Sequence, residues 1–446
     1  MFASSFIPSI SHARRCAGAN PPGKPDAVSL PRPVILLVCG LLFPAALIAQ
    51  QNGAAESAET LSLVQAVRIA VESEDPALAR LEARAESLEQ RAVSEAQLPD
   101  PKITGQFANV PVDSFSFDQT MMTQLKVGLR QEFPPGRSRA IKGEQRRLEA
   151  GVERARRRLE LRRIALETRH AWMELAYNEQ ALAIVSTGRE KVARQIESIS
   201  SRFATGRMTA QDVLRAELEL SLLDDRLAEH RRQADKARAA LSRYIGRNAF
   251  LTPGAWPELD VDGDAATLRN RLAEHPAVTV ENAEVEVADA GVSLAEQAYR
   301  PAFAIEGGYG VRPGFSDLAS IGVTLSVPLF TDKRQDRNRA AAVSRRGAEQ
   351  FDRDAVLLDL RRQLDQALSD WQRYNERVAL YRSALGERAR QTADASIATY
   401  ANGQTDFAEL IRSQLAELEV ALKRAELQSR AGQAWARIVY LAGEVS

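Results

Sequence analysis

The chain has 446 residues, enough for two or three domains, and its 59 Lys and Arg residues balance its 59 Asp and Glu residues. A net charge of zero gives no long-range attraction to nucleic acid, so we expect no nucleic-acid partner. Aromatic residues make up only 6%, whereas Ala, Leu, Glu, Arg and Gln dominate long stretches, which is typical of helices.

The first 49 residues differ from the rest and are expected to be a signal peptide. Basic residues precede the apolar run 34–48, and the small residue Ala49 follows it. The run is short for a membrane span and Pro44 interrupts it, although a retained N-terminal anchor is the alternative. The only two cysteines, Cys16 and Cys39, lie in this leader, so we expect no disulfide or thiol chemistry in the mature chain.

The remainder contains one pattern twice. "EDPAL" at 74–78 is matched by "EHPAV" at 274–278, Trp172 by Trp371, and Gly206 by Gly403, with offsets of 200, 199 and 197 residues. Ordered prolines, tryptophans and glycines at a nearly constant offset indicate tandem duplication. We therefore predict a first repeat at 50–247, a linker at 248–264 and a second repeat at 265–446.

Each repeat has the same predicted elements in chain order. A helical segment ends at a proline, two short alternating segments follow, and a very long helix leads to a glycine turn and a last helix. The expected helices cover 61–98, 138–204 and a segment ending near Ile245, then 265–298, 333–401 and a segment ending near Leu441. A helix of about 67 residues spans about 100 Å. Its length matches the two shorter helices together, so we expect those to stack end to end against it.

The alternating segments predict four strands, at 102–110, 125–133, 303–311 and 320–330. In the second of them Leu125, Val127 and Leu129 face one way, while charged and small residues face the other. Four strands cannot close a barrel, since the smallest membrane barrels use eight, and open strand edges are not tolerated in lipid. Either the sheet is soluble or several chains pool their strands, and the signal peptide favours pooling.

The ordered set of features resembles TolC-type outer-membrane efflux factors. The signal sequence, "LSLVQAVRIA" at 61–70, the proline and strand after the first helix, and F/Y-x-x-G followed by an acidic and then an apolar residue all fit that family. The resemblance covers about residues 60–444. It implies a mainly α protein with membrane β, in which a homotrimer gives four strands each to a twelve-stranded outer-membrane β-barrel. The helices form a barrel that extends into the periplasm.

The resemblance also implies partners and their contact sites. The glycine turns would meet a periplasmic adaptor protein, and an inner-membrane pump of the resistance-nodulation-division type would complete a tripartite system. The turn occurs twice because each duplicated hairpin needs an end. The expected adaptor contacts are Phe203, Gly206, Arg207, Tyr400, Gly403 and Gln404. The glycines supply the reversal and close approach that a side chain would hinder, and plain helix ends are the alternative.

Acidic residues follow each glycine turn. In a trimer, each of these acids would occur three times near one axis. A ring of like charges generally raises carboxylate pKa values and favours the passage of cations over anions. The resemblance implies an acidic narrowing here; Glu409 has the matching spacing, and Arg412 stands where the family often has a second acid. We expect a pore gate that opens by breaking Arg–Glu contacts, with helix-start carboxylates as the alternative. Its candidate residues are Asp212, Asp406, Glu409 and Arg412.

The cargo is suggested by the segments around the first strand pair. "LPDPKI", "NVPVD" and "QEFPPG" resemble the heavy-metal branch of the family, the partners of copper/silver or cobalt/zinc/cadmium pumps. Four scattered histidines and no mature cysteine predict no metal site and no cofactor. The pair Met121 and Met122 offers soft thioethers, but such a pair usually packs. A passive duct need not bind its cargo.

Three other functions can be compared with a metal-efflux channel: an enzyme, a periplasmic tether and a channel for another cargo. The sequence has no nucleophile elbow, phosphate loop or HExxH motif, so we do not expect an enzyme. A periplasmic coiled-coil tether would explain the helices but not the strand pairs. The same channel fold would also serve drug or organic-solute efflux or type I protein secretion.

Overall fold

The computed structural model describes residues 60–204 and 209–443. The expected signal peptide lies outside these residues, as do Gly206 and Arg207. The first half contains β1 (Thr60–Leu61), α1 (Leu63–Glu72), α2 (Pro76–Glu95), β2 (Lys102–Ala108), β3 (Gln124–Phe133), α3 (Ser138–Ala204), α4 (Ala210–Ile245), a 3-10 turn (Gly246–Phe250) and β4 (Thr252–Pro253). The second half contains α5 (Ala265–Arg271), a 3-10 turn (Leu272–Glu274), α6 (Pro276–Gln297), β5 (Ala302–Val311), β6 (Leu318–Ser326), α7 (Gln335–Leu380), a π turn (Tyr381–Leu385), α8 (Gly386–Ala401) and α9 (Phe407–Ala442).

The helical segments expected at 61–98 and 265–298 are each divided into two helices, α1 and α2 in the first half and α5 and α6 in the second. In both halves a proline occupies the first turn of the second piece, Pro76 in α2 and Pro276 in α6. Proline has no N–H to donate and its ring fixes a helical φ, so it starts a helix better than it continues one. The preceding side chains, Asp75 and His275, cap these new helices.

The two long helices differ in continuity. Helix α3 has the predicted bounds and runs unbroken for 67 residues. The helix expected at 333–401 begins at Gln335 and contains a π turn at Tyr381–Leu385 before α8. A β-carbon added to Gly386, the residue after this turn, would lie 2.8 Å from the Tyr381 carbonyl oxygen, so glycine accommodates the wider turn.

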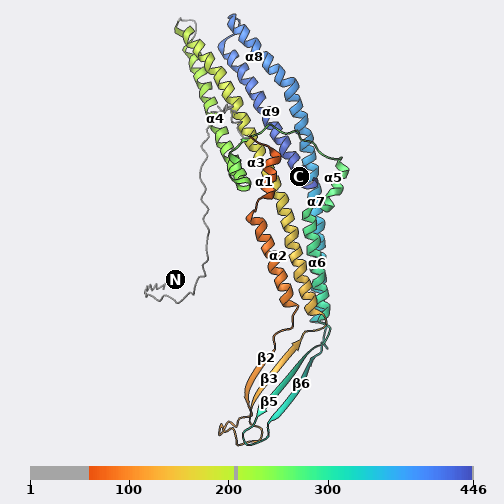
Figure 1. The fold of residues 1–446 in the computed structure, drawn as a ribbon. Coiled ribbons are helices and arrows are strands. Elements are labelled where there is room, and N and C mark those ends of the chain that lie inside the picture. Colours follow the sequence, from red (N-terminus) through yellow and green to blue (C-terminus); the bar gives the residue numbers. More distant parts are fainter. Residues whose placement is uncertain (1–59, 205–208, 444–446) are drawn as a thin grey trace, which may run out of the picture. The chain divides into compact units, whose positions relative to one another are not determined.

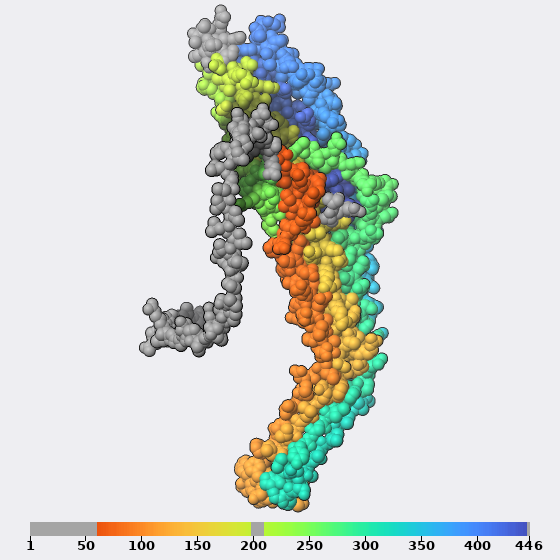
Figure 2. Space-filling view, in the orientation of Figure 1, coloured from red at the N-terminus to blue at the C-terminus, as the bar shows by residue number. Residues whose placement is uncertain are grey.

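The four long strands form one antiparallel sheet in the order β2-β3-β5-β6. Each half supplies one hairpin, and β3 joins β5 with Val127 opposite Tyr309. Figure 2 shows the orange strands of the first half beside the teal strands of the second. Strand β6 ends at Ser326 rather than at the expected 330, because Pro328 lacks the N–H that a strand ladder needs.

The helices form a layer with two edges. Helix α3 packs against α2 and α4 on one side and against α6 and α9 on the other. Helix α7 covers α6 and α9, and α8 packs against α9. This confirms that the long helix α3 is matched by shorter helices along its length. One edge of the layer is therefore α2 and α4, and the other is α7 and α8 (Figure 1).

The core at mid-length ties the chain's start and the linker to the helices. Trp172 of α3 is fully buried, and its Nε1 donates a hydrogen bond to the Leu61 carbonyl (2.9 Å). Trp435 of α9 likewise donates to the Asp260 carbonyl (2.6 Å). Strands β1 and β4 pair in parallel beside this core. The linker is thus held against both halves rather than looped away from them.

Candidate functional site

One face of the sheet is apolar and uncovered. Alternating side chains put Leu125, Val127 and Leu129 of β3 on it, about half exposed each. Val323 in the middle of β6 is 70% exposed. The other large apolar side chains exposed on this face are Ile103, Phe107, Phe303, Ile305, Tyr309, Val311, Ile321 and Leu325. Such a contiguous exposed apolar face needs a partner surface or lipid.

The opposite face of the same sheet is polar and ion-paired. Lys102 on β2 lies 2.8 Å from Glu132 on β3, and Arg130 on β3 lies 3.5 Å from Glu306 on β5. Thr324 on β6 donates a hydrogen bond to Glu306 (3.0 Å). The sheet therefore has an apolar and a wet side, the division expected of a strand that faces lipid on one side and a water-filled lumen on the other.

The sheet's outer strands are open. Among the described residues β2 pairs only with β3, and β6 pairs only with β5. Strands β3, β5 and β6 have nine or ten residues, which is the length of a tilted membrane-spanning strand. Open backbone edges on a sheet of this length require further strands if the apolar face lies in lipid.

The second helical hairpin ends in a well-formed turn. Gly403 has a φ of 70°, its N–H donates to the Tyr400 carbonyl (3.1 Å), and the Gln404 N–H donates to the Thr399 carbonyl (2.9 Å). These two bonds make a Schellman motif with glycine in the left-handed conformation. A β-carbon on Gly403 would contact nothing within 4 Å, so the backbone angle and not crowding requires glycine. Tyr400 packs edge-on against Phe407, with ring centres 5.9 Å apart.

The first hairpin is described up to Ala204 and from Thr209 onward. Phe203 belongs to the last turn of α3. Thr209 caps α4: its hydroxyl accepts from the Asp212 N–H (3.3 Å), and the Asp212 carboxylate accepts from the Thr209 N–H (3.3 Å). This reciprocal pair is a capping box. Asp212 thus has the helix-start role that the sequence left open as the alternative to a gate.

The three gate candidates of the second hairpin lie together at the start of α9. The Asp406 side chain accepts a hydrogen bond from the Glu409 N–H (2.8 Å) and caps the helix. The Glu409 carboxylate forms an ion pair with Arg412, and both side chains are exposed. Thr209 and Asp406 are equivalent caps, and Asp212 and Glu409 are equivalent third helical residues, since both pairs are 197 positions apart. In the described part of the chain, Arg412 forms its ion pair with Glu409 and none with Asp212.

A buried cluster holds the two hairpins together below their ends. Phe407, Leu410 and Ile411 of α9 pack with Val185 and Val192 of α3, and Leu223 of α4 completes the contact. Charged pairs flank it, including Lys191–Glu417 (2.9 Å) and Arg226–Glu419. The exposed Glu409 and Arg412 therefore project from a helix whose other side is fixed.

A second apolar stripe on α4 was not anticipated. One apolar stripe of this helix, made of Val213, Leu220, Leu223 and Leu227, packs inward. Leu214, Leu218 and Leu222 instead point to solvent, with 65%, 58% and 48% of their surface exposed. The four-residue spacing of these leucines is visible in the sequence. The sequence alone does not separate them from the inward stripe, because both recur at three- or four-residue steps along the same helix.

Residues 60–204 and 209–443 contain no group of three His, Cys, Asp or Glu side chains placed to hold a metal ion. Met121 and Met122 lie exposed in the loop between β2 and β3. No helix within the described ranges is long and apolar enough to cross a membrane.

Comparisons with known proteins agree with this geometry. The model of the outer membrane efflux protein family matches residues 267–444. Outer membrane efflux protein BepC of Brucella suis biovar 1 is 23% identical over 266 residues, which is 57% of this chain and 58% of that protein. The match thus spans less than two thirds of that relative's length.

Solved structures share the fold. A membrane protein from Pseudomonas aeruginosa superposes with a TM-score of 0.74 at 16% identity, over 85% of this chain and 90% of that one. CusC superposes with a TM-score of 0.72 at 13% identity, over 86% and 92%. The predicted mainly helical fold with a four-stranded sheet is confirmed. Residues 267–444, which cover α6, the hairpin of β5 and β6, and helices α7 to α9, are the part of the chain that is similar to the outer membrane efflux protein family.

Proposed function

We propose that this protein is the outer-membrane channel of a tripartite efflux system, and that it works as a homotrimer. The observation that carries the proposal is the four-stranded sheet, with one exposed apolar face, one ion-paired polar face and two open edges. Lipid would cover the apolar face, the polar face would line the passage, and neighbouring copies would close the edges.

Three copies account for the sheet better than two. Two copies would give eight strands, and the interior of an eight-stranded barrel is just wide enough for side chains to fill. Three copies would give twelve strands and leave a passage. In the order β2-β3-β5-β6, the outer strands run in opposite directions, so joining β6 of one copy to β2 of the next continues the antiparallel pattern.

The hairpin ends are the proposed contact for a periplasmic adaptor, which would couple the channel to an inner-membrane pump of the resistance-nodulation-division type. They lie at the end of the helical layer opposite the sheet (Figure 1). Around the second end, Tyr400 packs on Phe407 and Gly403 presents backbone without a side chain. Phe203, Gly206 and Arg207 belong to the same proposed contact, because they lie 197 positions before Tyr400, Gly403 and Gln404 in the repeated turn.

The gate is proposed at Asp406, Glu409 and Arg412, with Asp212 at the equivalent place of the first hairpin. The exposed Glu409–Arg412 pair would be repeated three times around the axis of a trimer. In planar bilayers, we expect Arg412→Ala to raise the conductance of the resting channel and its preference for cations. Lys423→Ala removes a similar pair, Lys423–Glu426, further along α9 and serves as the matched control. Equal conductance in both variants would contradict the gate.

Heavy-metal cations are the proposed cargo, on the strength of the sequence segments around β2 and β3. Deleting the protein from its host is expected to sensitise cells to copper, silver, cobalt, zinc or cadmium. Sensitivity confined to organic compounds, or a loss of protein secretion, would contradict the metal cargo and leave the channel standing.

A further inference from the structure

The polar face of the sheet has one positive charge more than it has negative charges. Its charged side chains are Lys102, Lys126, Arg130, Glu132 and Glu306, and β6 has none. Glu132 lies 2.8 Å from Lys102. Glu306 lies 3.5 Å from Arg130. Within residues 60–204 and 209–443 Lys126 forms no ion pair, so the surplus charge of this face is at Lys126.

Lys126 is well separated from the ion pairs of the same face. Arg130 and Glu306 are opposite each other in the register of β3 and β5. Lys126 lies four positions before Arg130, which is roughly 13 Å along a strand. In its own row, Lys126 is opposite Gln106 of β2 and Gly310 of β5, neither of which is charged. Since salt screens charges beyond about 8 Å under physiological conditions, the paired carboxylates do not neutralise Lys126.

A glycine leaves the space in which the Lys126 side chain lies along the sheet. A β-carbon added to Gly308 of β5 would be 2.7 Å from Cε of Lys126 and 2.9 Å from Oγ of Ser320. Lys126 on β3 and Ser320 on β6 thus approach the same glycine from the two strands that flank β5. The lysine is therefore surrounded by backbone and by uncharged polar groups.

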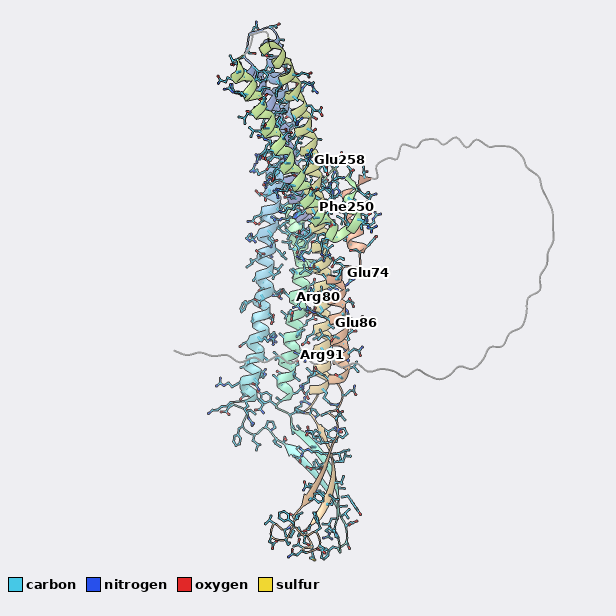
Figure 3. The ribbon with its side chains drawn as sticks, turned by 90° about the vertical axis from the view of Figure 1, so that its left-hand side faces the viewer. Glu74, Arg80, Glu86, Arg91, Phe250 and Glu258 are labelled. Carbon is cyan, nitrogen blue, oxygen red and sulfur yellow. The ribbon has the colours of Figure 1, made fainter. Side chains whose placement is uncertain are left out.

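The sheet occupies one end of the described chain, beyond the helices (Figures 1 and 3). Lys126 is the third residue of β3, close to the loop that joins β2 to β3, and the other end of β3 leads to α3. The acids of the adjoining loops are Asp113, Asp118 and Asp317, and in the part of the chain that the structure describes none of them forms an ion pair with Lys126. Asp317 instead accepts a hydrogen bond from the Arg312 N–H (3.2 Å). Lys126 would therefore lie near the outer mouth of the proposed channel.

We propose that Lys126 sets the ionic preference of the barrel section of the channel and makes that section favour anions over cations. The inference rests on the proposed trimeric channel and assigns a specificity-determining residue to it. Three copies would place three lysines around the passage at one level, with no acid in the same row. Rings of lysine side chains favour anions, as rings of carboxylates favour cations. A metal cargo would then pass this level more readily in complexes with anionic ligands than as bare divalent cations.

Reversal potentials in planar bilayers test the preference. A KCl gradient around 0.1 M is suitable, because a charge then acts over about 10 Å. Lys126→Gln is expected to lower the permeability ratio of chloride to potassium at least twofold, and Lys126→Glu should lower it further. Lys126→Arg keeps the charge and should keep the ratio. The matched control is Lys236→Gln, which removes an exposed lysine of α4 outside the sheet and should leave the ratio unchanged.

A thiol reporter measures the charge at this level independently of the rest of the passage. Ser320→Cys places beside Gly308 the only cysteine that follows the expected signal peptide. With Lys126 present, a negatively charged thiosulfonate should react faster relative to a positively charged one of similar size. Adding Lys126→Gln is expected to lower this rate ratio at least threefold.

The outcomes separate the inference from the proposed function. Open channels in which Lys126→Gln changes neither the permeability ratio nor the thiol rate ratio would overturn the inference and leave the channel intact. A protein that gives no channel conductance in any variant, including Lys236→Gln and the wild type, would contradict the proposed function and the inference with it.

Discussion

Asp75 and His275 lie 200 positions apart, and both cap the helix that follows them, one through a carboxylate and the other through an imidazole. Asp75 accepts a hydrogen bond from the Ala77 N–H (2.8 Å), and His275 accepts one from the Ala277 N–H (3.1 Å) through Nδ1. Each caps a helix that begins with proline. Their other contacts also correspond: Asp75 pairs with Arg243, and His275 bonds the carbonyl of Tyr440, 197 positions after Arg243. The break between two helices, which we call the joint, is therefore present in both halves, but its capping residue is a charged aspartate in the first half and a histidine in the second.

The histidine makes the second joint sensitive to acid. Burial, assisted by the charge of Arg162, lowers the pKa of His275 from 6.5 to about 4. The unfolded chain therefore takes up a proton near pH 6.5, whereas the folded chain resists until about pH 4, so stability falls as the pH drops through this window. Between pH 7 and 5 the loss is about 2 kcal/mol per chain.

His275→Asn tests this effect, because asparagine also caps helices well but does not titrate. Unfolding midpoints of the detergent-solubilised protein at pH 7 and pH 5 are the measurement. The variant should lose less stability on acidification than the wild type. Burial also lowers the pKa of His170, so part of the slope will remain. An unchanged pH slope in the variant would show that His275 is not the titrating group.

Two substitutions of Asp75 separate the contribution of its charge to stability from the contribution of its helix cap. The hydrogen bond from Arg243 is the main reason that the pKa of Asp75 is lowered, and Asp75 itself is buried. Asp75→Asn keeps the cap and removes the charge, which we expect to cost under about 1 kcal/mol because Arg243 is half exposed. Asp75→Ala removes both and should cost about 1–2 kcal/mol more. Equal loss in the two variants, measured by urea unfolding at pH 7, would show that the cap contributes nothing.

Replacing Gly403 by a residue with a side chain should destabilise the turn because of its positive φ angle. Gly403→Ala is expected to destabilise the second hairpin end by about 1–2 kcal/mol, since its φ of 70° is strained for alanine although space is free. Gly403→Asn is the matched control because asparagine tolerates this conformation better. Hydrogen exchange of the amides at 399–406 reports the change. Faster exchange in the asparagine variant than in the alanine variant would contradict the account.

The two faces of β6 should tolerate charge unequally. Val323 lies on the exposed apolar face, and Thr324, the next residue, contacts Glu306 on the polar face. Val323→Lys would place a charge in lipid, at a cost of about 2–4 kcal/mol near mid-membrane, and should reduce the assembled protein in the outer membrane. Thr324→Lys should assemble normally, because its ammonium group can pair with Glu306. The reverse pattern would show that the sheet faces are assigned the wrong way round.

Much of the fold was predictable because the signals were local and repeated. The bounds of α3 followed from 67 residues of helical composition between a proline-rich stretch and a glycine. The strand pairs followed from strict alternation, as in β3, where Leu125, Val127 and Leu129 share a face. The duplication then made each prediction in one half support the other.

The misses have physical causes. Pro76 and Pro276 were read within long helices, although a proline after a capping side chain starts a new one. The π turn at Tyr381–Leu385 has no signal in the sequence beyond Gly386. The roles of Asp212 and Glu409 stayed open because a carboxylate three residues into a helix serves a cap and a pore equally well. The exposed leucines of α4 were hidden because the buried leucines of the same helix have a similar spacing.

The most direct test of the central claim is the native mass of the protein extracted from the outer-membrane fraction in detergent. A species that requires detergent and has three times the mass of the mature chain is the predicted result, because only pooled strands can satisfy the open edges of β2 and β6. A water-soluble monomer or dimer recovered from the periplasm would contradict the channel and favour a periplasmic coiled-coil tether.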